Sequence, residues 1–266
     1  MAAKRVILIG NEKGGTGKST LAMNFIVYMM KKGKKVASVD LDGAQGTLTN
    51  YIKNRVEFAD KYRFRLDSPL HVSIAVDDMT DPYTADNNIG YFLRTMEEMA
   101  KKADVIVIDT PGSHNYMMPA AHACADTIVT PLNDSVIDLD VIARVDPDSF
   151  KVSGSGNYAQ TIWRARQERA KTNKSNLGWF VVKNRFGNLK CRHENQVDSL
   201  LQVLSKRMGF NVLDGMKERA VYRELFLKGL TVLDLKPDTD TGFNMSHIAA
   251  RQEIRAIVEA VLNNKS

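Results

Sequence analysis

The sequence holds few of the residues that build metal centres or disulfide frameworks. Its two cysteines, Cys124 and Cys191, lie far apart along the 266 residues and match no metal-ligand spacing, and its five histidines are scattered. Regularly spaced cysteines mark zinc sites and disulfide scaffolds, so their absence argues against both. The two thiols are expected to be buried or incidental.

Long hydrophobic runs and flexible linkers are missing as well. No apolar stretch approaches the roughly 18 residues that a membrane-spanning helix requires. The first apolar segment follows Met1 almost directly and leaves no space for a signal peptide, so we expect a cytoplasmic protein without membrane insertion. No linker rich in proline, glycine or serine and no internal repeat divides the chain. We therefore expect one domain over residues 1–266.

Charge is distributed unevenly. The whole chain has a formal net charge of +6, yet residues 151–228 hold 16 Lys and Arg against 6 Asp and Glu, a local excess of +10. A basic region of this kind is typical of proteins that contact polyanions, although a charged surface can also serve solubility alone. The pattern favours a polyanionic partner.

The strongest motif is RVILIGNEKGGTGKST over residues 5–20. A buried strand, a glycine-rich turn and a helix that starts at Lys18 follow in the order in which a P-loop holds a nucleotide phosphate chain. Lys18 is expected to neutralise the β and γ phosphates, and the Ser19 hydroxyl to bind Mg²⁺. Turns that end in GKS also occur by chance, but here the flanking strand and helix supply the required context. The predicted phosphate-binding residues are Gly14, Gly15, Thr16, Gly17, Lys18, Ser19 and Thr20.

Aspartates end two further predicted strands. VASVDLD presents Asp40 and Asp42, which point the same way because side chains alternate along a strand. DVIVIDTPGS ends the most strand-like run of the chain with Asp109, and its Thr-Pro-Gly forms a loop able to sense a γ-phosphate. Strand-end aspartates can be caps instead, but beside a P-loop we expect a metal site of Ser19, Asp40 and Asp109. Asp42 is expected to position the attacking water.

Strand and helix patterns alternate along the chain. Helices are expected after the P-loop and at about 47–62, 89–102, 158–174, 189–208, 216–227 and 246–262. Residues 63–86 are the least regular part, with one short strand expected at about 72–76. Because parallel strands need crossover connections that pack as covering layers, we expect the α/β class. The sequence predicts a mostly parallel, doubly wound sheet with helices on both faces.

One departure from the usual P-loop narrows the family. Glu12 stands where the pattern G-x-x-x-x-G-K-[ST] has its first glycine, and Lys13 follows, which is the deviant form of the motif. With VDLD, VIVIDTPG, PLNDS and VVKNR, it resembles the ParA/MinD group of deviant Walker ATPases. The strings PLNDSVIDLD, VDPDSF, WFVVKNR, LSKRMGF, ERAVYRELFLKGLTVLDL and SHIAARQEIR resemble the MipZ family of that group, which regulates division-site placement. The resemblance covers nearly the whole chain and is weakest over residues 62–86.

For that family the resemblance implies an ATP- and Mg²⁺-dependent sandwich dimer that hydrolyses ATP slowly. It further implies sequence-independent binding of double-stranded DNA on the nucleoid, contact with ParB and inhibition of FtsZ assembly. Matching positions make Lys13 the signature lysine that reaches the partner's nucleotide, so the implied catalytic set is Lys13, Lys18 and Asp42. Asp109 corresponds to the switch II aspartate, and Asn184 to the asparagine that reads the adenine edge. GAQGT after Asp42 departs from the family pattern, which leaves switch I undefined.

Three other functions remain open. A ParA-like ATPase of chromosome or plasmid partition is the nearest alternative, although the C-terminal strings favour the division regulator. A nitrogenase-type iron protein shares this P-loop but needs two suitably placed cysteines, which Cys124 and Cys191 do not provide. A metabolic ligase or kinase would need a small-molecule pocket that no residue pattern indicates. Candidates for DNA contact in the basic region are Arg164, Arg166, Arg169, Arg185, Lys190, Arg192 and Arg219.

Overall fold

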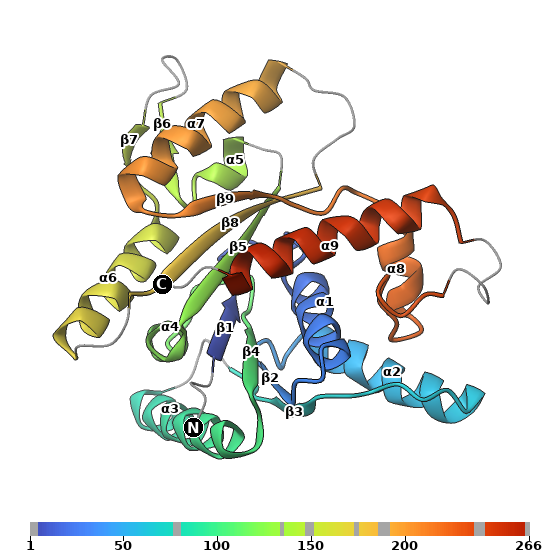
Figure 1. The fold of residues 1–266 in the computed structure, drawn as a ribbon. Coiled ribbons are helices and arrows are strands. Elements are labelled where there is room, and N and C mark those ends of the chain that lie inside the picture. The colour runs from blue at the N-terminus through green and yellow to red at the C-terminus, as the bar shows by residue number, and fades with distance from the viewer. Residues whose placement is uncertain are drawn as a thin grey trace.

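A parallel β-sheet forms the centre of the molecule (Figure 1). The computed structural model describes residues 5–76, 81–133, 136–146, 152–172, 176–185, 192–236 and 243–263. Within these residues seven strands pair in parallel in the order β3-β2-β4-β1-β5-β8-β9. Their bounds are β1 Arg5–Ile9, β2 Val36–Asp40, β3 Leu70–Ser73, β4 Val105–Asp109, β5 Thr127–Asn133, β8 Gly178–Asn184 and β9 Asn211–Asp214. The short strands β6 (Ala143–Val145) and β7 (Val152–Ser155) form a separate antiparallel pair.

Helices cover both faces of the sheet, which confirms the predicted fold class. One face carries α1 (Lys18–Lys31), α2 (Thr47–Tyr62), α8 (Ala220–Phe226) and α9 (Met245–Asn263). The other face carries α3 (Pro82–Lys102), α4 (Met118–Cys124), α6 (Asn157–Lys171) and α7 (Arg192–Met208). The single turn α5 (Val136–Leu139) follows β5. Each face therefore encloses its own hydrophobic core.

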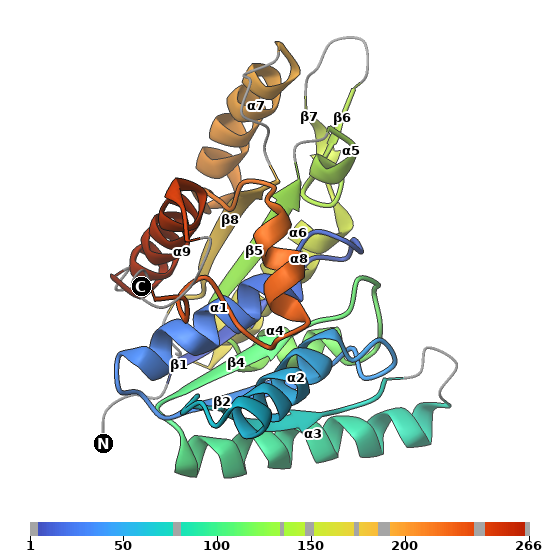
Figure 2. The same cartoon turned by 90° about the vertical axis from the view of Figure 1, so that its right-hand side faces the viewer.

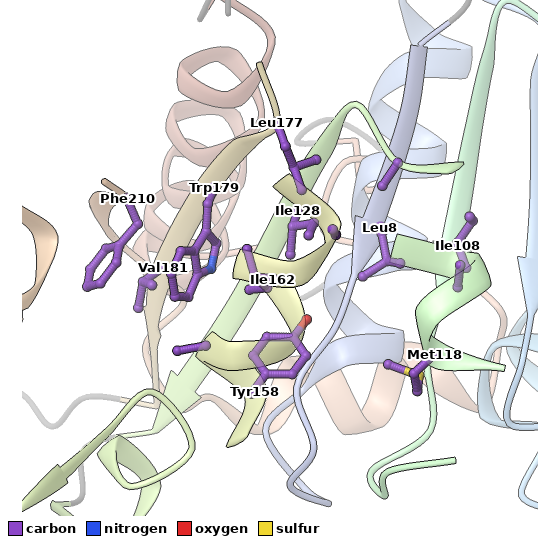
Figure 3. Packing of buried hydrophobic residues seen from close by; sticks show 14 of the residues in the cluster. Leu8, Ile108, Met118, Ile128, Tyr158, Ile162, Leu177, Trp179, Val181 and Phe210 are labelled. Atoms are coloured by element: carbon purple, nitrogen blue, oxygen red, sulfur yellow. The ribbon is translucent and has the colours of Figure 1, made fainter. Parts of the chain in front are cut away.

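The helix α1 lies deepest among the helices on its face. Figure 2 shows it over the sheet between α9 and α2. Every residue from Leu21 to Met29 is buried, so this helix is apolar almost all round. On the opposite face, Figure 3 shows Trp179 of β8 beside Ile162 of α6. The Trp179 ring also packs on Phe210, with the ring centroids 4.8 Å apart.

Strand register brings the predicted acidic residues together. Asp109 is the last residue of β4 and pairs across the sheet with Asp40 of β2 on one side. On its other side Asp109 pairs with Ile9, the last residue of β1 and the start of the glycine-rich loop. Ligands of open parallel sheets bind beyond the carboxyl ends of the strands, so this edge of the sheet is where a binding site is expected.

The largest difference from the sequence prediction is the start of α3. This helix begins at Pro82 and not near residue 89. The Asp81 side chain caps it by accepting hydrogen bonds from the backbone N–H groups of Tyr83 and Thr84, and Pro82 suits the first helical turn. The short strand β3 likewise lies slightly earlier than expected. The remaining predicted helices agree with the structure to within a few residues, whereas α4, α5, the β6-β7 pair and the edge strand β9 were not predicted.

Candidate functional site

A cleft of about 620 Å³ opens at the carboxyl ends of the central strands. The glycine-rich loop forms one wall, and the loops after β2 and β4 form the others. The residues that line it are Gly14, Gly15, Gly17, Lys18, Ser19, Thr20, Asp42, Ala44, Gln45, Thr47, Val76, Pro111, Gly112, Ser113, Asn115 and Arg185. The structure thus brings together most of the predicted phosphate loop with Asp42.

Two glycines hold the glycine-rich loop in a left-handed backbone conformation directly before α1. Gly15 and Gly17 have φ angles of 73° and 86°, which only glycine adopts without strain. A Cβ at Gly17 would also lie 2.3 Å from Nδ2 of Asn184. No side chain caps the start of α1, so its first N–H groups are free to bind an anion. The buried hydroxyl of Thr16 likewise has no hydrogen-bond partner among the described residues.

Lys18 is a buried cation at the centre of the cleft. Its side chain is 7% exposed, and its Nζ donates a hydrogen bond to the carbonyl oxygen of Lys13 at 2.7 Å. Burial lowers the pKa of Lys18, and the negative charges of Asp109 and Asp42 oppose that change. A desolvated ammonium that donates to one carbonyl among the described residues is well suited to bind a phosphate.

Asp109 is the residue whose surroundings best fit a bound cation. It is 1% exposed, and among the described residues neither carboxylate oxygen has a partner within strict hydrogen-bond geometry, although the Ser19 hydroxyl lies close. Burial and the nearby Asp40 raise the pKa of Asp109 to about 8, while the Ser19 hydroxyl and Lys18 act in the opposite direction. Hard divalent cations prefer oxygen ligands of this kind. Ser19 and Asp109 would hold a Mg²⁺ ion, which would neutralise this carboxylate, so the residues fit the ion.

Asp40 was predicted to be a metal ligand, but in the structure its carboxylate accepts hydrogen bonds from the protein. Asp40 is fully buried, and both of its carboxylate oxygens already accept hydrogen bonds. Oδ1 accepts from the backbone N–H of Asp42 at 3.0 Å, and Oδ2 accepts from the N–H and hydroxyl of Thr49 at 2.9 and 2.7 Å. The geometry corrects the predicted role, because Asp40 anchors the turn that presents Asp42.

Asp42 itself faces the cleft with a half-buried carboxylate. Burial raises its pKa, a backbone hydrogen bond at Gln45 lowers it, and the charge of Asp40 raises it further. The positive charge of Lys18 lowers the pKa of Asp42. The carboxylate therefore lies between an acidic neighbour and a cation at the place where a phosphate chain would end.

The second lysine of the motif turns away from the cleft. Nζ of Lys13 lies 3.1 Å from Oδ1 of Asp138 in α5, within the same chain, and Lys13 does not line the cavity. Its backbone N–H donates to Asn11. Nearby, Glu12 and His114 join the glycine-rich loop to the loop after β4, with 3.0 Å between Oε1 and Nδ1. In the free chain Lys13 is thus close to the phosphate loop but held by an ion pair.

Two consecutive residues at the end of β8 complete the site. Asn184 is buried, and its Nδ2 donates to the carbonyl oxygen of Thr16 at 2.6 Å, so this amide holds the phosphate loop. Its predicted contact with adenine stays a prediction. Arg185 has a left-handed φ of 56° and lines the cleft. The sequence analysis named Arg185 only as a candidate for DNA contact and did not predict its place at the cleft. The signal that could have found it is its place directly after a parallel strand.

The remaining candidates for DNA contact lie in different surroundings in the structure. Arg164 is exposed on α6. Arg169 is a correction, because it is 5% exposed and donates to the Ala125 carbonyl and to Asp126, which withdraws it from any DNA surface. Arg219 forms two hydrogen bonds to the Glu253 carboxylate at 2.6 and 2.9 Å. Arg166 donates to backbone carbonyls, and its place is described below.

Other candidates lie outside what the structure describes. Lys190 and Cys191 fall outside the described residues, and nothing is described of the Arg192 side chain. The thiol of Cys124 is half-buried. Within the described ranges, no three His, Cys, Asp or Glu side chains cluster as metal ligands, and no helix is both long and apolar enough to span a bilayer.

The chain is similar to known proteins in sequence and in structure, and it matches a family model. It is 29% identical over 153 residues to the chromosome-partitioning ATPase Soj of Thermus thermophilus, which covers 53% of this chain and 60% of the relative. It therefore spans less than two thirds of that relative. It is 24% identical to the maintenance of carboxysome distribution protein A of Halothiobacillus neapolitanus, over 86% of this chain and 87% of the relative.

A solved structure supports the fold. The septum site-determining protein MinD of Pyrococcus horikoshii, in complex with Mg-ADP, superposes with a TM-score of 0.58 at 18% identity, over 98% of this chain and 97% of that chain.

The family model described as ATPase MipZ matches residues 5–264, which is nearly the whole sequence. The chain therefore belongs to the MipZ family of ATPases.

Proposed function

We propose that the chain binds ATP with Mg²⁺ in the cleft and hydrolyses it to ADP and phosphate. The observation that carries this proposal is the buried Asp109 carboxylate, which lies close to Ser19 and Lys18 and has no strict hydrogen-bond partner in the part of the chain that the structure describes. When bound, Mg²⁺ supplies charge neutralisation for phosphoryl transfer. Lys18 and the open N–H groups of α1 hold the phosphates, and Asp42 orients the attacking water. Ser19 and Asp109 face the ion, while Asp40 is left out because its oxygens are occupied.

Two copies of the chain then enclose the nucleotides in a sandwich dimer. Lys13 crosses to the partner's phosphates, and for this its ion pair with Asp138 must open. Because a second positive charge is available only in the dimer, hydrolysis is slow in the monomer and limits the lifetime of the dimer. The P-loop identity of the motif and the family membership support this role.

The biological role that fits best is regulation of division-site placement. The chain would act on the nucleoid as a single domain, with its dimer binding double-stranded DNA without sequence preference, contacting ParB and inhibiting FtsZ assembly. Family membership and the +10 excess over residues 151–228 support this role. The alternative is a ParA-like partition ATPase, favoured by the similarity to Soj. Sedimentation of FtsZ polymers with this protein and ATP separates the two, since only the division regulator reduces the polymer fraction.

Size-exclusion chromatography with light scattering tests the ATP-dependent dimer. Asp42→Ala should retain ATP, lose most of its hydrolysis and elute as a dimer with ATP and Mg²⁺. Lys13→Ala should bind ATP with nearly unchanged affinity but remain a monomer. Lys34→Ala is the matched control, because this exposed lysine at the end of α1 lies outside the cleft and should behave as the unmodified protein.

Two results would overturn the assignment. Normal hydrolysis by Asp42→Ala would remove the carboxylate from the reaction. Loss of ATP binding by a folded Lys13→Ala variant would show that this lysine acts within its own subunit and not across a dimer.

A further inference from the structure

A second cavity, of about 810 Å³, lies between α6 and α7 and shares no lining residue with the nucleotide cleft. Its floor is apolar and belongs to the core. Ile162 and Trp179 face each other there from α6 and β8, as Figure 3 shows, and Met208 closes the end of α7. Trp163 stands at the border with 61% of its surface exposed. An opening onto apolar core residues beside an exposed tryptophan is typical of an interface anchor site.

The border of this cavity is strongly basic. Arg164 of α6 and the neighbours Lys206 and Arg207 of α7 line it with exposed side chains. No ion pair engages any of these three among the residues that the structure describes. None of the lining residues is acidic. Three unpaired cations around an apolar floor favour a ligand that carries negative charge next to an apolar group.

Arg166 explains why the ligand must accept hydrogen bonds. Its guanidinium lies over the Trp179 ring, 5.7 Å from the centroid, and donates to the carbonyl oxygens of Met208 and Gly209 at 2.6 and 2.5 Å. These carbonyls at the cavity wall are therefore occupied as acceptors. Nε of Arg166 is buried and has no hydrogen-bond partner within the described ranges. The charged groups at this wall thus offer donors and almost no acceptors.

We propose that this cavity binds an acidic peptide segment of a partner protein. An aromatic or long aliphatic side chain of the peptide enters over Ile162 and Trp179, and its carboxylates pair with Arg164, Lys206 and Arg207. Trp, Arg and Met are enriched in such anchor sites. Duplex DNA offers the same negative charge but presents phosphates on a rigid rod, with no side chain that could fill an apolar cavity. Charge complementarity alone would fit both, whereas the apolar floor favours the peptide.

The two tryptophans of the chain make this site directly observable. Trp163 and Trp179 are the only tryptophans in the sequence, and both line the cavity. The first step is a selection of random displayed peptides without tryptophan on the full-length protein. The enriched peptides should share a net negative charge and at least one aromatic or long aliphatic residue. A synthetic copy of one enriched peptide, titrated into the protein, should change the tryptophan fluorescence saturably.

Variants distinguish this site from general charge attraction. The triple variant Arg164→Gln, Lys206→Gln, Arg207→Gln should bind the peptide about 10-fold or more weakly, because three exposed ion pairs are lost. The control triple Lys32→Gln, Lys34→Gln, Lys35→Gln removes three exposed cations elsewhere and should bind normally. A peptide whose apolar residues are replaced by serine should lose the fluorescence change. Circular dichroism confirms that each variant is folded.

Three outcomes would overturn the proposal. The selection could enrich no peptides or peptides without negative charge. The triple variant could bind as tightly as the control. A short DNA duplex could give the same fluorescence change and displace the peptide completely, which would assign the cavity to the DNA surface.

Discussion

Asn184 and Gly17 meet at the base of the phosphate loop. The Asn184 side chain occupies the space where a Cβ of residue 17 would lie, and its amide donates to the carbonyl oxygen of Thr16. The end of β8 therefore fixes the shape of a loop that lies 168 residues earlier in the chain. At this scale the same amide is both a support for the loop and the predicted adenine contact.

Asn184→Ala separates these two roles. If the amide supports the loop, ATP and inorganic triphosphate should both bind about 10-fold more weakly, which corresponds to the loss of one buried hydrogen bond of about 1.4 kcal/mol. Isothermal titration calorimetry measures both affinities. Asn54→Ala is the control, because Asn54 also donates to a backbone carbonyl, that of Phe226, but away from the cleft. A loss restricted to ATP would instead support adenine reading.

His122 is a fully buried imidazole on α4. Its Nδ1 donates to the carbonyl oxygen of Met118 at 2.7 Å, and its Nε2 lies 3.3 Å from the hydroxyl of Tyr158. Burial lowers the pKa of His122 to about 4, partly offset by the hydrogen bond at Met118. Because the unfolded chain takes up a proton near pH 6.5 and the folded chain does not, stability is present above that pH and falls as the pH drops towards 4.

The free energy of unfolding should therefore decrease by about 2 kcal/mol between pH 7 and pH 5 through this one group. Urea unfolding at the two pH values measures the change. His122→Gln keeps a polar side chain that does not titrate, so its loss between the same pH values should be smaller by about that amount. Equal losses for both proteins would contradict the assigned neutral, buried state.

At the scale of elements, the buried pair Arg55 and Asp234 joins α2 to the segment after α8. Both side chains are 2% exposed, and their contacts measure 2.8 and 3.0 Å. Arg55 also donates to the carbonyl oxygens of Asp67 and Gly229. Burial acts to raise the pKa of Asp234, but the hydrogen bonds and charge of Arg55 hold it below its usual value. The pair thus fixes three segments at once.

Arg55→Met should destabilise the protein by about 3 kcal/mol or more, since it leaves the Asp234 carboxylate buried with fewer partners. Adding Asp234→Leu should restore much of that loss, because an apolar pair needs no solvation. Lys53→Met on the same helix removes an exposed cation and should change stability by less than about 1 kcal/mol. Chemical denaturation gives all three values. A double variant no more stable than Arg55→Met would refute the assigned cause.

The sequence predicted those features whose chemistry lies in adjacent residues, and it missed those that depend on contacts between distant elements. The glycine-rich loop and the strand that ends in Asp109 were predictable because adjacent residues carry their chemistry. The early start of α3 was predictable too, since Asp81 and Pro82 form a helix-start signal that the interpretation did not use. The partners of Asp40, Lys13 and Asn184 lie on other elements, and only the packed fold determines them.

At the scale of the whole molecule, the arrangement of cations decides how DNA could bind. Arg169 and Arg219 are engaged inside the protein, so fewer phosphate contacts are available to one subunit than the count of basic residues indicates. A dimer doubles the available contacts. The affinity for DNA should then depend on the nucleotide state.

Binding of a short duplex by the Asp42→Ala variant should require ATP and weaken steeply between about 50 and 200 mM salt, with log K falling by about 0.9 per phosphate contact for each decade. Fluorescence anisotropy measures it. Arg164→Ala should weaken all sequences alike, since phosphate contacts read no bases. Arg219→Ala, whose partner is Glu253, should have little effect. Equal affinity with ADP and ATP, or a flat salt response, contradicts the proposal.

The cover of α1 has a consequence for the synthesis of the chain. Arg5 in the first strand donates to the carbonyl oxygens of Val261 and Leu262, and Tyr28 of α1 donates to Glu259, all in the last helix. The ribosome releases β1 and α1 more than 200 residues before α9. An almost wholly apolar helix therefore stays without its cover until α9 has emerged, in a state that chaperones bind and that is prone to aggregation. The native packing of this face forms only after α9 has left the ribosome.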